Sequence, residues 1–142
     1  MGTVTLYRPV GLKELELIQD AGYRAFPPRL EWQPIFYPVL NEDYAAQIAL
    51  QWNTQDEFSG FCGIVTQFEL NRTHYSKYEV QNVGGVEHNE LWVPAEELPA
   101  FNDQIAEGIK VIKVFFGEQF VMPVHPQLAT LLSKFKRDVH YE

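Results

Sequence analysis

The amino-acid sequence predicts an α+β fold, and three observations support this class. Segments rich in β-branched and aromatic residues recur along the chain, separated by segments whose apolar residues have helical spacing. These strand and helix patterns are mixed without the strict strand–helix–strand order of parallel α/β folds. The chain has 142 residues, of which 46% are hydrophobic, and this length and composition suit one hydrophobic core.

Six segments have the composition of β-strands. The segment from Phe61 to Leu70 alternates most regularly between two faces. Arg8, Tyr37 and Val93 each precede a proline, which holds them extended and marks the end of a short strand. The predicted strands are residues 3–7, 34–37, 61–70, 78–81, 90–93 and 109–116.

The helical segments are recognised by their apolar spacing and their terminal residues. Gly22 is placed as the C-terminal stop of the first helix, Asn41 as the N-cap of the second, and Pro94 as the first residue of another. The predicted helices are residues 11–21, 41–52, 73–77, 94–102 and an amphipathic helix after Pro126. We therefore expect a domain over residues 1–117, followed by a C-terminal extension over residues 118–142 that contains the last helix.

Charge and cysteine content exclude several classes of function. A formal net charge of -8 has the wrong sign for binding a nucleic-acid backbone, so no nucleic-acid partner is expected. The single cysteine, Cys62, forms no internal disulfide and no zinc motif, which predicts a reducing cytoplasmic location and no metal site. We interpret Cys62 as a small core residue. No apolar run is long enough to cross a membrane, so no membrane partner is expected.

Three side chains with useful chemistry lie near predicted strand ends. Arg8 can hold a diphosphate through two hydrogen bonds, and the Tyr37 ring can stack on a planar base. The Glu90 carboxylate can bond a ribose hydroxyl or stabilise a developing oxocarbenium ion. Together they would suit a dinucleotide whose glycosidic bond is being broken. Arg24 and Arg29 are further cations near the proline-rich loop over residues 23–34.

Four segments carry a resemblance to a known family. They are TLYRPVGLKELELIQDAGYRAFPPR, PIFYPVLNEDYAAQIALQW, GFCGIVTQFEL and HNELWVPAEELPAFNDQIAEGIKVIKVFFG. They resemble small bacterial proteins whose family name combines ADP-ribosylation with crystallin, and their order is similar to that of the ADP-ribosyltransferase fold. The resemblance covers residues 3–117 and implies a split mixed or antiparallel sheet with short flanking helices.

The resemblance also implies a substrate and roles for four residues. Arg8 in LYRP matches the first motif of the superfamily, Tyr37 in IFYP the second, and Glu90 in HNELWVP the third. The resemblance implies an NAD-dependent ADP-ribosyltransferase or an NAD glycohydrolase that cleaves the nicotinamide–ribose bond. NAD would then be the substrate, with its diphosphate near Arg8, its nicotinamide ring against Tyr37 and Glu90 as the catalytic carboxylate. His88 falls where many transferases that modify proteins carry a Gln or Glu, so it joins Arg8 and Tyr37 as a cofactor-binding candidate. The acceptor is unidentified, and proteins are among the candidates.

A second hypothesis belongs to a different class. The chain has no Ser-Thr-Ser element after the second strand, where Pro38 stands instead. This departure favours a non-catalytic module that keeps the fold and binds a protein or a nucleotide without turnover. The two hypotheses differ in whether Arg8, Tyr37 and Glu90 meet in an open cleft, or whether Phe26 or Trp32 fills that space.

Overall fold

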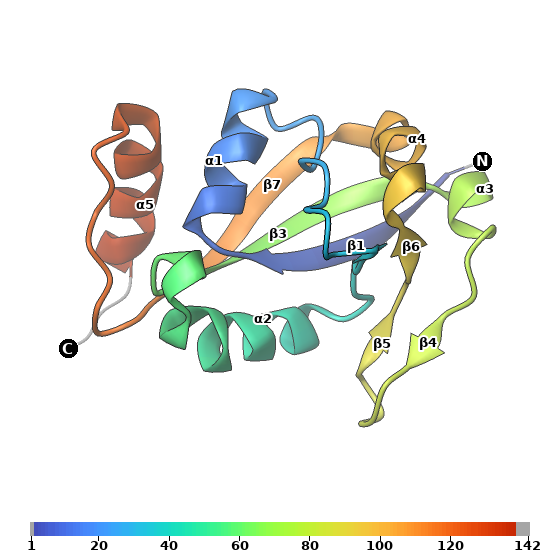
Figure 1. Ribbon diagram of the computed structural model, residues 1–142, viewed down its shortest axis with the longest axis horizontal. Coiled ribbons are helices and arrows are strands. Elements are labelled where there is room, and N and C mark those ends of the chain that lie inside the picture. The colour runs from blue at the N-terminus through green and yellow to red at the C-terminus, as the bar shows by residue number, and fades with distance from the viewer. Residues whose placement is uncertain (1, 139–142) are drawn as a thin grey trace.

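The computed structural model describes residues 2–138, and its centre is a three-stranded antiparallel sheet in the order β1-β3-β7 (Figure 1). The strands are β1 (Thr3–Val10), β3 (Cys62–Asn71) and β7 (Ile105–Phe116). Leu6 pairs with Phe68, and Ile64 pairs with Val114, so apolar side chains of neighbouring strands lie on the same face. The chain therefore has the α+β organisation that the sequence predicts.

Different helices cover the two faces of this sheet (Figure 1). Alternate residues of β3 point to opposite faces, so Ile64 and Phe68 enter the main core, whereas Val65 enters a smaller one. The main core contains side chains of α1 and α5, and the smaller core contains side chains of α2. These helices are α1 (Leu12–Asp20), α2 (Glu42–Gln51) and α5 (Pro126–Asp138).

The outer edge of β1 is paired only in part. The N–H of Tyr7 donates to Val39 O over 2.9 Å, and the N–H of Val39 donates back over 2.8 Å. The next residue of β1 that faces this edge is Pro9, which has no N–H to donate. Pairing along the outer edge is therefore not available at Pro9, and the sheet opens there between α1 and α2.

Short strands continue the structure beyond Val39. Val39 also bridges to Glu90, and Leu91 donates its N–H to Pro38 O over 2.9 Å. This segment thus joins β1 to the hairpin that contains Glu90. The short strands pair as β2 (Ile35–Phe36) with β6 (Val93–Pro94) and as β4 (Gln81–Asn82) with β5 (Asn89–Glu90).

The remaining helical elements are short. They connect the longer strands and helices and pack at their ends. They are α3 (Arg72–Tyr75), α4 (Leu98–Asp103) and the 3₁₀ turns η1 (Asn53–Gln55), η2 (Glu57–Ser59) and η3 (Ala95–Glu97).

Two helix-end predictions are confirmed. Asn41 caps α2 by accepting a hydrogen bond from the N–H of Tyr44 over 3.0 Å. Gly22 follows α1 with φ +67°, the left-handed conformation that glycine adopts without strain. Cys62 is buried in the main core, as expected.

Other local predictions are wrong at element boundaries. β1 continues through Arg8 and Pro9 to Val10, because Pro9 lacks only a donor on the edge that faces away from β3. The predicted strand over residues 90–93 is divided between β5 and β6. Pro94 does not start a helix; it pairs with Ile35 in β6, and a 3₁₀ turn follows it. The last strand of the sheet starts at Ile105, four residues before its predicted start.

The C-terminal helix packs on the same main core as the sheet. Leu128 and Leu132 of α5 are buried there, and Leu131 and Phe135 pack against them. Residues 139–142 of the predicted extension lie outside the described residues. None of the helices described between residues 2 and 138 has the length and apolar character needed to cross a membrane.

Candidate functional site

A cleft of about 690 Å³ opens beside the partly paired edge of β1. Its walls come from α1, from the loop before β2, from α2 and from the η1–η2 segment. This volume lies within the range of small-molecule sites. Arg8, Tyr37 and Glu90 all line the cleft, whereas His88 is not among its lining residues. Neither Phe26 nor Trp32 fills it: Phe26 is buried in the main core, and Trp32 is 75% exposed.

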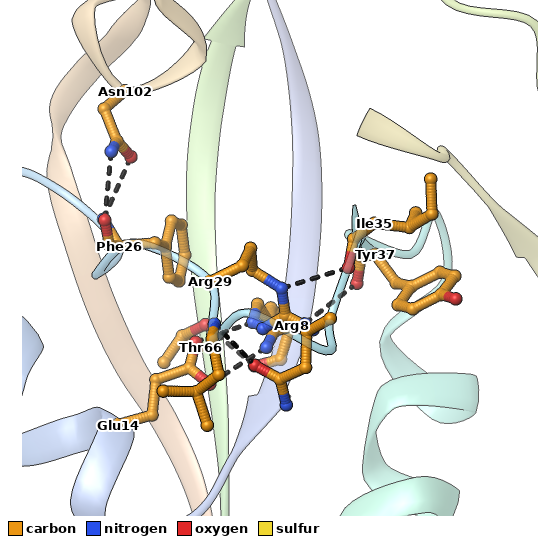
Figure 2. Close-up of polar contacts among 10 residues, drawn as sticks. Arg8, Glu14, Phe26, Arg29, Ile35, Tyr37, Thr66 and Asn102 are labelled. Carbon is orange, nitrogen blue, oxygen red and sulfur yellow. Dashed lines mark hydrogen bonds and ion pairs between the residues drawn. The ribbon is translucent and has the colours of Figure 1, made fainter. Parts of the chain in front are cut away.

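Arg8 lies at the base of the cleft and is already engaged by other protein groups (Figure 2). Its Nε and Nη2 donate to the two carboxylate oxygens of Glu14 over 2.7 and 2.9 Å, the bidentate geometry of a strong ion pair. Nη1 donates to the carbonyl of Tyr37 over 3.3 Å, and the guanidinium carbon lies 4.6 Å from the centre of the Phe36 ring. Arg8 is only 8% exposed. These contacts hold the loop and α1 against β1.

Arg29 stands beside this pair and keeps most of its donors available. Its Nε donates to the carbonyl of Ile35 over 3.0 Å (Figure 2). Its Nη groups donate to no acceptor in the part of the chain that the structure describes. Burial, and then repulsion from Arg8, lower the pKa of Arg29, although Glu14 and Tyr37 act in the opposite direction. An arginine remains protonated under such conditions, so Arg29 presents a positive charge to the cleft.

Glu90 reaches the cleft at the end where α2 begins. Its Oε2 accepts a hydrogen bond from the hydroxyl of Tyr44 over 2.6 Å, and its Oε1 accepts one from Trp92 Nε1 over 2.9 Å. Burial raises the pKa of Tyr44 to about 12, and the hydrogen bond and charge of Glu90 add to this effect. His88 stacks on the Tyr44 ring, with ring centres 4.4 Å apart and planes at 17°. His88 therefore supports the residue that orients Glu90.

The Tyr37 ring points away from the Arg8 guanidinium, so only the Tyr37 backbone takes part in the Arg8 network (Figure 2). The ring is 41% exposed, which leaves a face open to a ligand. It belongs to a set of large apolar side chains that line the cleft while remaining exposed to solvent. The others are Leu17, Leu30, Trp32, Trp52 and Phe58.

The opposite end of the cleft contains a chain of polar side chains. Asn53 Nδ2 donates to Ser59 Oγ over 2.9 Å, and Ser59 Oγ donates to Asp56 Oδ2 over 2.7 Å. All three residues line the cleft. Asn53 Oδ1 is buried and accepts no hydrogen bond from the described residues.

The sequence predicts part of this site and misses the rest. The convergence of Arg8, Tyr37 and Glu90 follows from Val39, which bridges to both β1 and Glu90. The sequence identifies Arg29 only as a further cation, because no sequence pattern predicts that Glu14 forms an ion pair with Arg8. The polar chain from Asn53 through Ser59 to Asp56 falls in a stretch that has the composition of an ordinary loop. No local signal marks it.

Comparisons of this chain with protein-family models, with curated proteins and with solved structures found no match. Within residues 2–138, no group of three or more His, Cys, Asp or Glu side chains could hold a metal ion. The chemistry of the cleft therefore carries the functional argument.

Proposed function

We propose that the protein binds an NAD-class dinucleotide in this cleft and cleaves its nicotinamide–ribose bond. The observation that carries this proposal is the meeting of a cation, an exposed aromatic ring and an oriented carboxylate in one cleft. These are Arg29, Tyr37 and Glu90, and the cleft measures about 690 Å³. A dinucleotide offers a matching group to each of them: a diphosphate, a planar ring and a ribose.

The cation that meets the diphosphate is Arg29 rather than Arg8. Glu14 takes two donors of Arg8, and the Tyr37 carbonyl takes a third. Within residues 2–138 only the Nε of Arg29 donates a hydrogen bond, so its two Nη groups are available for a bidentate contact with phosphate oxygens. Arg8 then acts as a positioning residue, because it anchors the carbonyl of Tyr37 and the ring of Phe36 beside Arg29.

Glu90 supplies the chemistry. The bond between the nicotinamide nitrogen and ribose C1′ breaks, and its electron pair leaves with neutral nicotinamide. C1′ becomes an oxocarbenium centre, which the Glu90 carboxylate stabilises. Water, or a nucleophilic group of an acceptor, then adds to C1′ and releases a proton to solvent. The hydrogen bonds from Tyr44 and Trp92 hold the carboxylate in place, and each of its oxygens retains a second lone pair.

The arrangement of the sheet supports the same proposal. A sheet that opens beside β1, with short strands continuing past Val39, agrees with the split sheet of an ADP-ribosyltransferase-like fold. In that arrangement Glu90 is the last residue of the second strand of the late hairpin, and Tyr37 follows a short strand. We place the acceptor at the open mouth of the cleft.

A second candidate is nucleotide binding without turnover. The observation that favours it is that both oxygens of Glu90 already accept hydrogen bonds from the protein. If these bonds fill the space that a ribose hydroxyl needs, the dinucleotide binds and stays intact.

The test measures NAD+ binding by calorimetry and nicotinamide release by chromatography on the same samples. We expect saturable binding that Arg29→Ala weakens about 10- to 100-fold, the loss typical of hydrogen bonds to a charged group. Glu90→Gln keeps binding but lowers nicotinamide release at least about 100-fold. Arg24→Ala is the matched control, because Arg24 is exposed in the same loop and does not line the cleft.

Each outcome has one meaning. Binding without nicotinamide release in the wild-type protein selects the second candidate. Absence of NAD+ binding at millimolar concentration overturns both candidates. If Arg24→Ala and Arg29→Ala lower the affinity for NAD+ equally, the effect is one of overall charge, and Arg29 does not contact the ligand.

A further inference from the structure

We propose that the end of the cleft formed by Trp52, Phe58 and Asp56 is a base subsite that selects adenine over its oxo counterpart, hypoxanthine. This inference rests on the proposed binding of an NAD-class dinucleotide, and it assigns the second base of that ligand. Three features of the described residues carry it: the length of the cleft along α2, two exposed aromatic rings, and two acceptor oxygens, Asn53 Oδ1 and Asp56 Oδ1, that receive no hydrogen bond from those residues.

Helix α2 sets the distance between the two ends of the cleft. Glu90 accepts a hydrogen bond from Tyr44, which lies in the first turn of α2, and Trp52 follows the last turn as the C-cap of this helix. Eight residues of helix separate Tyr44 from Trp52, which is about 12 Å at 1.5 Å per residue. Ile48, one turn before Trp52, also lines the cleft. A ligand whose reactive ribose meets Glu90 therefore carries its second base along α2 toward Trp52.

Two aromatic side chains at that end are largely exposed to solvent. Trp52 is 59% exposed, and Phe58 is 92% exposed. Both line the cleft. Neither belongs to the hydrophobic cores, so core packing does not explain why large rings occur there. A planar base that stacks on them would bury their apolar surface.

The polar groups at this end leave two acceptor oxygens without a donor among the described residues. The Ser59 hydroxyl has a single proton, which it donates to Asp56 Oδ2, so it must accept the bond from Asn53 Nδ2. This direction fixes the orientation of the Asn53 amide, and no donor of the described residues reaches its Oδ1, although Asn53 is only 4% exposed. Asp56 Oδ1 likewise accepts no hydrogen bond within the described part of the chain.

An acceptor-lined base subsite discriminates between amino and oxo substituents. The exocyclic amino group of adenine donates hydrogen bonds, and we place it against Asp56 Oδ1. Hypoxanthine carries a carbonyl oxygen at the same ring position, which would face the carboxylate and leave both groups without a donor. Such a mismatch lowers the magnitude of the binding free energy by more than the loss of one hydrogen bond, because the carbonyl oxygen and the carboxylate are both left without a hydrogen-bond donor.

The experiment compares the binding of NAD+ and of nicotinamide hypoxanthine dinucleotide by calorimetry. The wild-type protein is expected to bind NAD+ at least about tenfold more tightly. In Asp56→Asn, the new amide can keep the Ser59 bond through its oxygen, so its nitrogen takes the place of Oδ1 and donates. This variant is expected to bind the two dinucleotides equally or to prefer the hypoxanthine form.

Two further variants keep the test decisive. Glu57→Gln removes a charge from the same turn at an exposed residue outside the cleft, and it should retain the wild-type preference. Phe58→Ala changes a ring that is 92% exposed, so it leaves the fold intact and is expected to weaken both dinucleotides about 5- to 100-fold.

The outcomes separate this inference from the proposed function. Equal binding of the two dinucleotides to the wild-type protein overturns the base subsite and leaves NAD+ binding standing. A preference for NAD+ that is unchanged in Asp56→Asn, or affinities unchanged in Phe58→Ala, also overturn the subsite. Absence of binding by either dinucleotide overturns the proposed function and this inference together.

Discussion

At the scale of single residues, the cleft is built from side chains that hold one another in place. Arg8 is neutralised by Glu14, and Glu90 is fixed by Tyr44 and Trp92. Such pairs keep a charged group in one geometry before a ligand arrives, which lowers the cost of binding. Among the described residues no acceptor takes the Nη donors of Arg29, so a ligand can engage them.

The Tyr44–Glu90 hydrogen bond can be tested without any ligand. The folded protein holds the pKa of Tyr44 at about 12, above the ordinary tyrosine value of 10.0, first through burial and then through Glu90. Because the folded-state pKa is raised, this contribution to stability is complete below about pH 10 and is lost as the pH rises toward about 12. Glu90→Gln should lower the pKa of Tyr44 toward 10, though not fully, because burial remains.

A phenolate absorbance titration measures this change while circular dichroism confirms that the protein is folded. One tyrosine should titrate at lower pH in Glu90→Gln than in the wild-type protein. Glu57→Gln serves as the control, because it removes the same charge at an exposed residue outside the cleft. Superimposable curves for Glu90→Gln and the wild-type protein would contradict the hydrogen bond.

At the scale of elements, the close packing of α2 on β3 positions the wall of the cleft. Gly63 of β3 lies against the backbone of Ala49 in α2, so that a Cβ on Gly63 would overlap Ala49 O. Only glycine allows this approach, and it keeps Ile48 and Trp52 beside the edge of β1. The requirement comes from space rather than from backbone torsion.

Gly63→Ala should therefore destabilise the protein by at least about 2 kcal/mol, because the added methyl group meets backbone that cannot rotate away. The free energy of unfolding in urea measures the effect. Gly85→Ala is the control: the atoms nearest to its Cβ would belong to the exposed-loop side chain of His88 rather than to backbone, and a change of about 0.5 kcal/mol or less is expected. Similar values for the two variants would show that α2 can move away from β3.

At the scale of the whole molecule, α5 completes the main core instead of extending away from it. Leu128 and Leu132 are buried among the side chains that α1 and the sheet contribute. The basic side chain of Lys136 lies over the rings of Phe116 and Phe120, which ties the helix to the end of β7. We therefore expect the sheet and α5 to unfold together.

Leu132→Ala should lower the free energy of unfolding by about 3 kcal/mol, since it removes a fully buried side chain and leaves a cavity. Fluorescence and circular dichroism should report one coincident transition for both the variant and the wild-type protein. Lys134→Ala, at an exposed position of the same helix, is expected to change stability by about 0.5 kcal/mol or less. Two separate transitions would mean that α5 folds independently of the sheet.

Features that depend on neighbouring residues follow from the sequence alone. Alternation along residues 61–70 predicts β3, and the caps at Asn41 and Gly22 are correctly placed, because periodicity and capping act within a few residues. Pro94 is misplaced for the complementary reason. Its local preference for a helix start gives way to pairing with Ile35, a residue far away in the chain.

The assembly of the candidate site, in contrast, follows from tertiary contacts. Val39 bridges to both β1 and Glu90, and this pairing brings Arg8, Tyr37 and Glu90 to one cleft. The pairing of Arg8 with Glu14 leaves Arg29, rather than Arg8, as the arginine available to a ligand. These pairings depend on which groups, brought together by folding, compete for the same hydrogen-bond or ion-pair partner. No local sequence pattern predicts the result of that competition.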